Sequence, residues 1–84
     1  MSRRAKVYVT LKSGVLDPQG KTVQRALQSL GHGAVTEVRQ GKYFELALAD
    51  GLGEAEARQM VEQIAREVLT NTVIEDFRFE LEGR

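Results

Sequence analysis

Cysteine is absent from this chain of 84 residues, and proline and histidine occur once each. Without cysteine, a disulfide framework and thiolate metal sites are excluded. A chain of this length encloses a single core and buries only about 60 to 65% of the surface that its unfolded form exposes. We therefore expect residues 1–84 to form one domain, stabilised by internal packing or by oligomerisation.

The sequence also has no excess charge of either sign. It contains 12 Lys and Arg residues against 12 Asp and Glu residues, so its formal net charge is zero. No overall field would attract nucleic acid or an anionic membrane. No apolar run approaches the ~20 residues of a membrane-spanning helix, and Lys6 and Lys12 interrupt the segment where a secretory signal would be continuously apolar. We expect a cytoplasmic protein with neither nucleic acid nor membrane as its partner.

Motifs for catalysis are missing as well. The only histidine, His32, lies in a Gly-His-Gly loop with no serine or cysteine motif attached. No histidine pair and no carboxylates at metal-ligand spacing support a zinc site or an acid-base pair. The glycines at 51 and 53 lack the pattern of a phosphate-binding loop. The sequence predicts no catalytic residue, no metal site and no cofactor site in this chain.

Alternation of polar and apolar residues predicts four strands. The first covers residues 6–12, and the second and third lie within 35–48 on either side of a tight turn at Gln40-Gly41. The last includes Val73, Phe77, Phe79 and Leu81, which share one face.

Apolar residues at helical spacing predict two helices. The first begins with Asp17 as its cap and Pro18 in its first turn, and it runs to Leu30. The second follows Gly53 and has an apolar stripe formed by Ala57, Met60, Val61, Ile64, Ala65 and Val68.

The resulting order βαββαβ predicts an α+β fold of ferredoxin-like type. Right-handed crossovers would place both helices on one face of a four-stranded antiparallel sheet. The other face would be uncovered, and it would contain Lys6, Tyr8, Thr10, Val38, Tyr43, Glu45, Ala47, Arg78 and Glu80. Two tyrosines among small apolar residues are typical of a protein contact surface. The simpler alternative is a solvated face with scattered apolar residues.

RNA recognition is a sharper alternative, because RNA-recognition domains share this topology. They stack bases on aromatic residues of the two central strands, where Tyr8 and Tyr43 would lie. However, residues 41–45 (Gly-Lys-Tyr-Phe-Glu) lack the glycine-aromatic spacing of the RNA-binding motif. The predicted face also contains acids, and the chain has no net basic charge. The sequence therefore disfavours RNA binding.

Three segments resemble the PurS family, the small subunit of phosphoribosylformylglycinamidine synthase. They are residues 15–20 (Val-Leu-Asp-Pro-Gln-Gly) with the helix that follows, residues 41–45, and residues 69–75 (Leu-Thr-Asn-Thr-Val-Ile-Glu). Many members of the family have proline where this chain has Thr72, a departure that affects only a turn. The resemblance brackets nearly the whole chain.

The resemblance implies a role in purine biosynthesis, at the step that makes formylglycinamidine ribonucleotide from formylglycinamide ribonucleotide, glutamine and ATP. In that family a glutaminase, PurQ, releases ammonia, and a synthetase, PurL, uses ATP and magnesium. A PurS homodimer, or a higher homo-oligomer, bridges the two and supports ammonia transfer without chemistry of its own. The family thus implies that this chain is a non-catalytic subunit of a ligase complex and has no cofactor.

Two groups of residues are candidate contacts in such a complex. We expect Tyr8, Val38, Tyr43 and Ala47 to form the contact between two copies, because the predicted open face is self-complementary in character. We expect the loop at 15–20 and the turn at 71–75 to face the larger subunits, which would involve Asp17, Gln19, Asn71 and Glu75.

Two other classes share the βαββαβ order. A regulatory module of ACT type would have a ligand-binding glycine loop after the first strand, where only Gly14 is present. An acylphosphatase would need an arginine in that loop, where this chain has Asp17-Pro18. Assays of amino-acid binding and of phosphatase activity would separate these classes from an adaptor.

Overall fold

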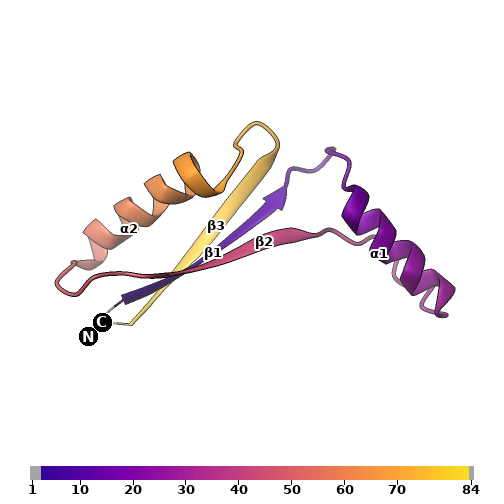
Figure 1. The fold of residues 1–84 in the computed structure, drawn as a ribbon, viewed down its shortest axis with the longest axis horizontal. Helices are drawn as coiled ribbons and strands as arrows, with labels where there is room; N and C mark the ends of the chain where they lie inside the picture. The colour runs from indigo at the N-terminus through magenta and orange to yellow at the C-terminus, as the bar shows by residue number, and fades with distance from the viewer. Residues whose placement is uncertain (1–2, 84) are drawn as a thin grey trace.

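A computed structural model describes residues 3–83 of the chain. Its elements are β1 (Arg3–Leu11), α1 (Pro18–Ser29), β2 (Gly41–Ala47), α2 (Glu54–Ile64), a π-helical turn (Ala65–Leu69) and β3 (Glu75–Gly83). The three strands form an antiparallel sheet with β1 in the centre, in the order β2-β1-β3 (Figure 1).

The expected four-stranded sheet is wrong, because residues 35–40 form no strand. The segment is bonded to the end of β1 and the loop after it instead. The backbone N–H of Gln40 donates to the carboxylate of Asp17, and the guanidinium of Arg39 donates to the carbonyls of that loop. The segment is extended, as a strand would be, but it is tied to a loop and not to a strand.

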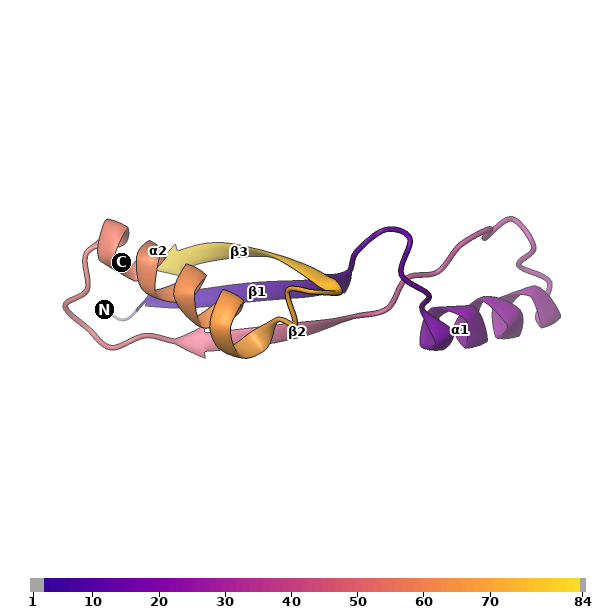
Figure 2. The ribbon, with the colours of Figure 1, turned by 90° about the horizontal axis from the view of Figure 1, so that it is seen from above.

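The expectation that both helices cover one face is also wrong. Helix α2 lies over the sheet, whereas α1 projects beyond the end of the sheet (Figures 1 and 2). The molecule is accordingly elongated, with extents of 51 × 27 × 14 Å and a radius of gyration of 16.5 Å. A compact domain of this length has a radius of gyration of about 12 Å. Helix α1 is an arm outside the core.

The core lies between the central strand and α2. Ala5, Val7 and Val9 of β1 are fully buried, and Val61 of α2 packs with them beside two buried alanines, at 57 and 65. Small residues on α2 let the helix lie close to the sheet. The largest fully buried side chains are valines, whereas all three phenylalanines, at 44, 77 and 79, are only partly buried.

The last strand begins later than the sequence predicts. Val73 was expected on its inner face, but it lies in the preceding turn and is 80% exposed. Asn71 closes this turn, because its side-chain oxygen accepts the N–H of Val73 and its carbonyl accepts the N–H of Glu75. An asparagine that bonds to the backbone two residues later stabilises a turn against a strand.

Candidate interaction surfaces

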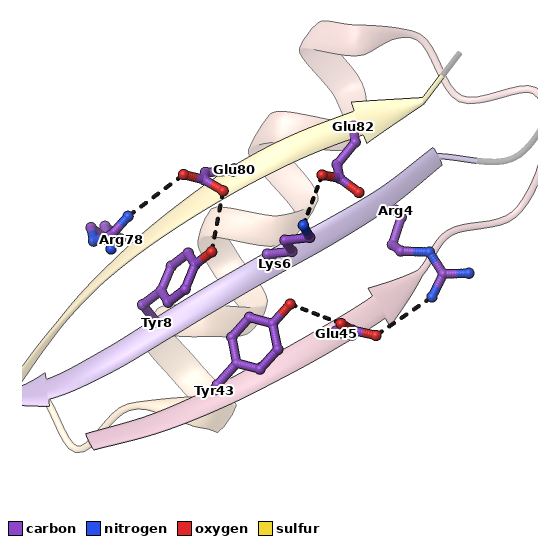
Figure 3. A network of polar contacts seen from close by, with 8 residues as sticks. All are labelled: Arg4, Lys6, Tyr8, Tyr43, Glu45, Arg78, Glu80 and Glu82. Carbon is purple, nitrogen blue, oxygen red and sulfur yellow. Dashed lines mark hydrogen bonds and ion pairs between the residues drawn. The ribbon is translucent and has the colours of Figure 1, made fainter. Parts of the chain in front are cut away.

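The sheet face opposite α2 is uncovered and contains both tyrosines of the chain (Figure 3). The strand register places Tyr8 of β1 between Tyr43 of β2 and Arg78 of β3. The two tyrosine rings have their centroids 5.2 Å apart, and the guanidinium of Arg78 lies 4.0 Å from the centroid of the Tyr8 ring. Stacking of this kind pre-orders three large side chains on a surface open to a partner.

Polar contacts across the strands complete this open sheet face. The hydroxyl of Tyr8 donates to Glu80 at 3.2 Å, and the hydroxyl of Tyr43 donates to Glu45 at 2.8 Å. Ion pairs join Lys6 to Glu82, Arg4 to Glu45 and Arg78 to Glu80. Exposed pairs of this kind add little stability, but together they hold the side chains in one arrangement. Acids and bases are interleaved, so the face has no field of one sign.

Tyr8, Tyr43 and Ala47 lie on the open face, as the alternation along the strands predicts, and their contact between two copies stays a prediction. Ala47 is exposed opposite Arg4. Val38 does not join them, because the strand that would have placed it there is absent. It lies before β2, where its carbonyl touches Gly20 of α1.

The hydroxyl of Tyr43 offers a probe of this face. Partial burial, and then the hydrogen bond to the Glu45 carboxylate, raise the pKa of Tyr43 above its ordinary value of 10.0. In a Tyr8→Phe background Tyr43 is the only tyrosine, so tyrosinate absorbance reports it alone. We expect Glu45→Gln to lower this pKa, because the carboxylate that disfavours the phenolate is removed. An unchanged titration curve would mean that the Tyr43 to Glu45 contact does not form in solution.

A second surface lies at the end of the sheet where the loop after β1 meets the turn before β3. The N–H of Lys12 donates to the carbonyl of Ile74 at 2.8 Å and joins the two segments. An open pocket of about 470 Å³ lies beside them. Its lining is formed by Leu11, Asp17, Pro18, Gln19, Gln40, Gly41, Lys42 and Glu75.

Three of the loop residues singled out from the sequence thus line one pocket, and the fourth supports it. Asp17, Gln19 and Glu75 contribute to the lining, and the N–H of Asn71 donates to the Glu75 carboxylate at 2.8 Å. Lys42 pairs with the same carboxylate at 3.4 Å. Sequence reasoning did not include Lys42, which the strand register brings to the pocket.

Asp17 does more than cap α1. Its side chain is 6% exposed, and it accepts the N–H of Gly20 at 2.9 Å and the N–H of Gln40 at 2.7 Å. These backbone donors, that of Gln40 first, lower the pKa of the Asp17 carboxyl below its ordinary value. One carboxylate therefore joins the start of α1 to the segment that leads from α1 back to the sheet.

Arg39 also ties the segment after α1 to the end of β1 and the loop that follows it. Its guanidinium donates to the carbonyls of Leu11, Lys12 and Val15 at 3.0 to 3.2 Å. We refer to Asp17, Gly20, Arg39 and Gln40 together as the joint of the arm. Sequence reasoning missed the joint, since the bonds of Arg39 and Gln40 connect residues more than 20 positions apart.

The described part of the chain offers neither a metal site nor a membrane-spanning helix. Within residues 3–83, no three His, Asp or Glu side chains lie close enough to hold a metal ion. None of the helices in this range is long and apolar enough to cross a membrane.

These features define a small α+β protein with ordered aromatic and polar side chains on open surfaces. Such surfaces suit assembly with other chains. The family model for PurS, phosphoribosylformylglycinamidine (FGAM) synthase, matches residues 4–83. Phosphoribosylformylglycinamidine synthase subunit PurS of Bacillus subtilis is 46% identical over 79 residues, which cover 94% of this chain and 92% of the relative.

Solved structures agree with this match. The structure of PurS from Thermus thermophilus superposes with a TM-score of 0.87 at 34% identity, covering 100% of this chain and 99% of that one. A chain of the PurLQS structure from Thermotoga maritima gives a TM-score of 0.82 at 26% identity, covering 98% and 100%. The chain belongs to the PurS family of phosphoribosylformylglycinamidine synthase subunits.

Proposed function

We propose that this chain is a non-catalytic adaptor in phosphoribosylformylglycinamidine synthase, acting in the cytoplasm. It bridges the glutaminase PurQ and the synthetase PurL and supports transfer of ammonia between them. The observation that carries the proposal is the likeness, over 98% of this chain, to a chain of the PurLQS structure. ATP and magnesium are used by the synthetase, and this chain holds no cofactor.

The physical features of the chain support an adaptor. An adaptor needs ordered surfaces, and this chain has one set of ordered polar groups on the open sheet face and another around the pocket at the end of the sheet. The two surfaces are on different parts of the molecule, so they can contact two partners at once. A bridge between subunits requires this separation.

We assign the open sheet face, with Tyr8, Tyr43 and Ala47, to contact between copies of this chain in a homodimer or higher homo-oligomer. Its interleaved acids and bases are suited to a second copy of the same face. We assign the pocket with Asp17, Gln19 and Glu75, and the turn at Asn71, to the larger subunits. Loops held by a rigid scaffold are where such contacts concentrate.

Replacing Tyr8 with glutamate tests the first assignment. The new carboxylate would remove the stacked ring and lie beside Glu80, so self-association through this face should weaken by about tenfold or more. Light scattering after size exclusion measures the mass of the homo-oligomer. Gln59→Glu is the matched control, because Gln59 is exposed on α2 away from this face. If both variants keep the parental mass, the contact between copies lies elsewhere.

Co-purification tests the adaptor role itself. The chain is mixed with the PurQ and PurL proteins of its own source, glutamine and a magnesium nucleotide, and passed over size exclusion with light scattering. We expect one complex that contains all three proteins and more than one copy of this chain. Three separately eluting proteins under these conditions would contradict the proposal.

A further inference from the structure

The strand β3 lies at one margin of the sheet, and its outer side faces no other strand of residues 3–83 (Figure 2). The N–H of Lys12 donates to the carbonyl of Ile74, a pair that continues the register of β1 with β3. Bonded pairs alternate in an antiparallel ladder, so every second residue of β3 directs its backbone groups to β1 and the others direct theirs outward. The N–H of Glu75 in the outward set is bonded to the carbonyl of Asn71. The remaining outward residues, which we call the outer edge of β3, are Phe77, Phe79 and Leu81.

The outer edge of β3 lacks the structural features that usually keep a sheet edge from pairing. Natural sheets protect their edges with proline, with bulges or with very short strands. The strand β3 has nine residues, its register with β1 continues without a bulge from Glu75 to Gly83, and the only proline of the chain is Pro18. An unprotected edge of this kind is a template for one more strand.

Charge is the one protection that β3 has, and it is mostly of one sign. The strand contains four acids and one base, whereas β2 contains one of each. The side chains of Asp76, Glu80 and Glu82 stay 70%, 54% and 48% exposed, although each pairs with a cation of this chain. A second copy of β3 on this edge would place acids beside acids, which is unfavourable. The charge therefore favours an occupant rich in lysine or arginine.

The central strand shows which sequence pattern pairs with β3. On the open face Lys6 of β1 lies opposite Glu80. On the inner face Val7 lies opposite Phe79, which stays partly exposed at the margin of the core. A strand added on the outer edge would meet the same acids and the same phenylalanines from the other side. Its residues would therefore alternate between basic and apolar.

We propose that the outer edge of β3 binds an extended segment of a larger subunit, with basic and apolar residues in alternation, as an added strand of the sheet. The inference rests on the adaptor role proposed above and adds the mode of binding. Glu75 begins β3 and also lines the pocket that we assign to the larger subunits, so one subunit can fill the pocket and continue along the edge. Main-chain hydrogen bonds supply the affinity in strand addition, and alternate side chains supply the specificity.

Hydrogen exchange of the backbone amides tests the strand addition. The isotope-labelled chain is exchanged alone and in its complex with PurQ and PurL, quenched, released and read by nuclear magnetic resonance. We expect the amides of Phe77, Phe79 and Leu81 to exchange about 100-fold or more slowly in the complex, because their N–H groups become bonded. The amides of Arg78 and Glu80 are already directed to β1 and should change much less. A surface that is covered without strand pairing would not produce this alternation.

Replacing Leu81 with proline tests the same bonds through the affinity. Proline removes an outward N–H and leaves the ladder to β1 complete, as on natural edge strands. Leu81→Ala is the matched control, since it loses the leucine side chain but keeps the N–H. We expect the proline variant to bind the larger subunits about tenfold more weakly than the alanine variant. Equal affinities would contradict the proposal, and if the proline variant does not fold, the exchange measurement decides.

Neutralising acids of β3 tests the basic character of the segment. The variant Asp76→Asn, Glu82→Gln removes two carboxylates together with their ion pairs to lysines. The control Glu54→Gln, Glu62→Gln removes two exposed ion pairs from α2. We expect only the β3 variant to bind the larger subunits about fivefold more weakly, with both isolated variants keeping the parental mass by light scattering. Equal binding by the two variants would overturn the proposal, because the segment would not be basic.

The outcomes of the exchange measurement separate the strand addition from the adaptor role. A complex in which the outward amides exchange as fast as in the isolated chain overturns the strand addition and leaves the adaptor role standing. Slow exchange of these amides in the isolated chain means that a second copy occupies the edge, which also overturns the proposal. If no complex forms with PurQ and PurL, the adaptor role and the strand addition fail together.

Discussion

Replacing Gly20 with alanine should lower the free energy of unfolding by about 1 to 3 kcal/mol, the cost of forcing atoms into a packed site. A Cβ at this position would collide with the carbonyl oxygen of Val38 and lie 2.8 Å from a carboxylate oxygen of Asp17. Helix propensity alone predicts the opposite, since alanine is favoured over glycine by ~1 kcal/mol inside a helix. The sign of the effect therefore decides whether the joint exists. Urea denaturation at fixed protein concentration measures it.

Gly33 supplies the matched control. It lies between α1 and β2, and an added Cβ there would meet no atom within 4 Å. Gly33→Ala should leave stability within ~0.5 kcal/mol of the parent. If Gly20→Ala were as neutral as Gly33→Ala, or stabilising, the backbone of residues 35–40 would not pack against α1 as described.

Replacing Val61 with alanine should destabilise the protein by about 2 kcal/mol, from the loss of buried methyl groups and the cavity that remains. Val61 is fully buried between α2 and the central strand, in a core whose largest fully buried side chains are valines. For a domain of this size, such a loss lowers the melting temperature by roughly 10 °C. Differential scanning calorimetry at constant concentration gives the shift.

Val73→Ala removes the same groups from a side chain that is 80% exposed. Its melting temperature should stay within about 2 °C of the parent. Equal shifts for the two variants would contradict the position of the core, or would show that a partner copy covers Val73.

Local pattern was enough to predict the strands of the sheet and both helices. The alternation through Val7 and Val9 reflects a strand with one buried face, and the register then brings Tyr8 against Tyr43 as expected. The helix after Asp17-Pro18 begins where its cap predicts. These features depend on residues close in sequence, or on the two-residue period of a strand.

The missed features depend on contacts between distant residues. Residues 35–40 are extended in either case, and only the bonds from Asp17 and Arg39 decide that they meet a loop and not a strand. The apolar spacing of Val23 and Leu30 correctly predicted an amphipathic helix, but spacing cannot tell that this helix projects beyond the end of the sheet. Val38 was misplaced for the same reason, because its assignment assumed a strand.

The same distinction applies to the candidate surfaces. Tyr8, Tyr43 and Ala47 could be grouped from the sequence because they lie at alternate positions of neighbouring strands. Asp17, Gln19 and Glu75 were chosen as loop residues, and their meeting in one pocket with Lys42 follows from the sheet register. The sequence therefore indicated residues that the fold brings together, but not their arrangement, and their contact with larger subunits stays a prediction.

The adaptor role is tested most directly by omitting this chain from the reconstituted synthase of its own source. Formylglycinamidine ribonucleotide formation is measured with glutamine and, separately, with ammonia as the nitrogen donor. The account predicts that omission abolishes the glutamine-dependent reaction, because PurQ and PurL are no longer joined, and that the ammonia-dependent reaction of PurL continues. Undiminished glutamine-dependent synthesis without this chain would contradict the account.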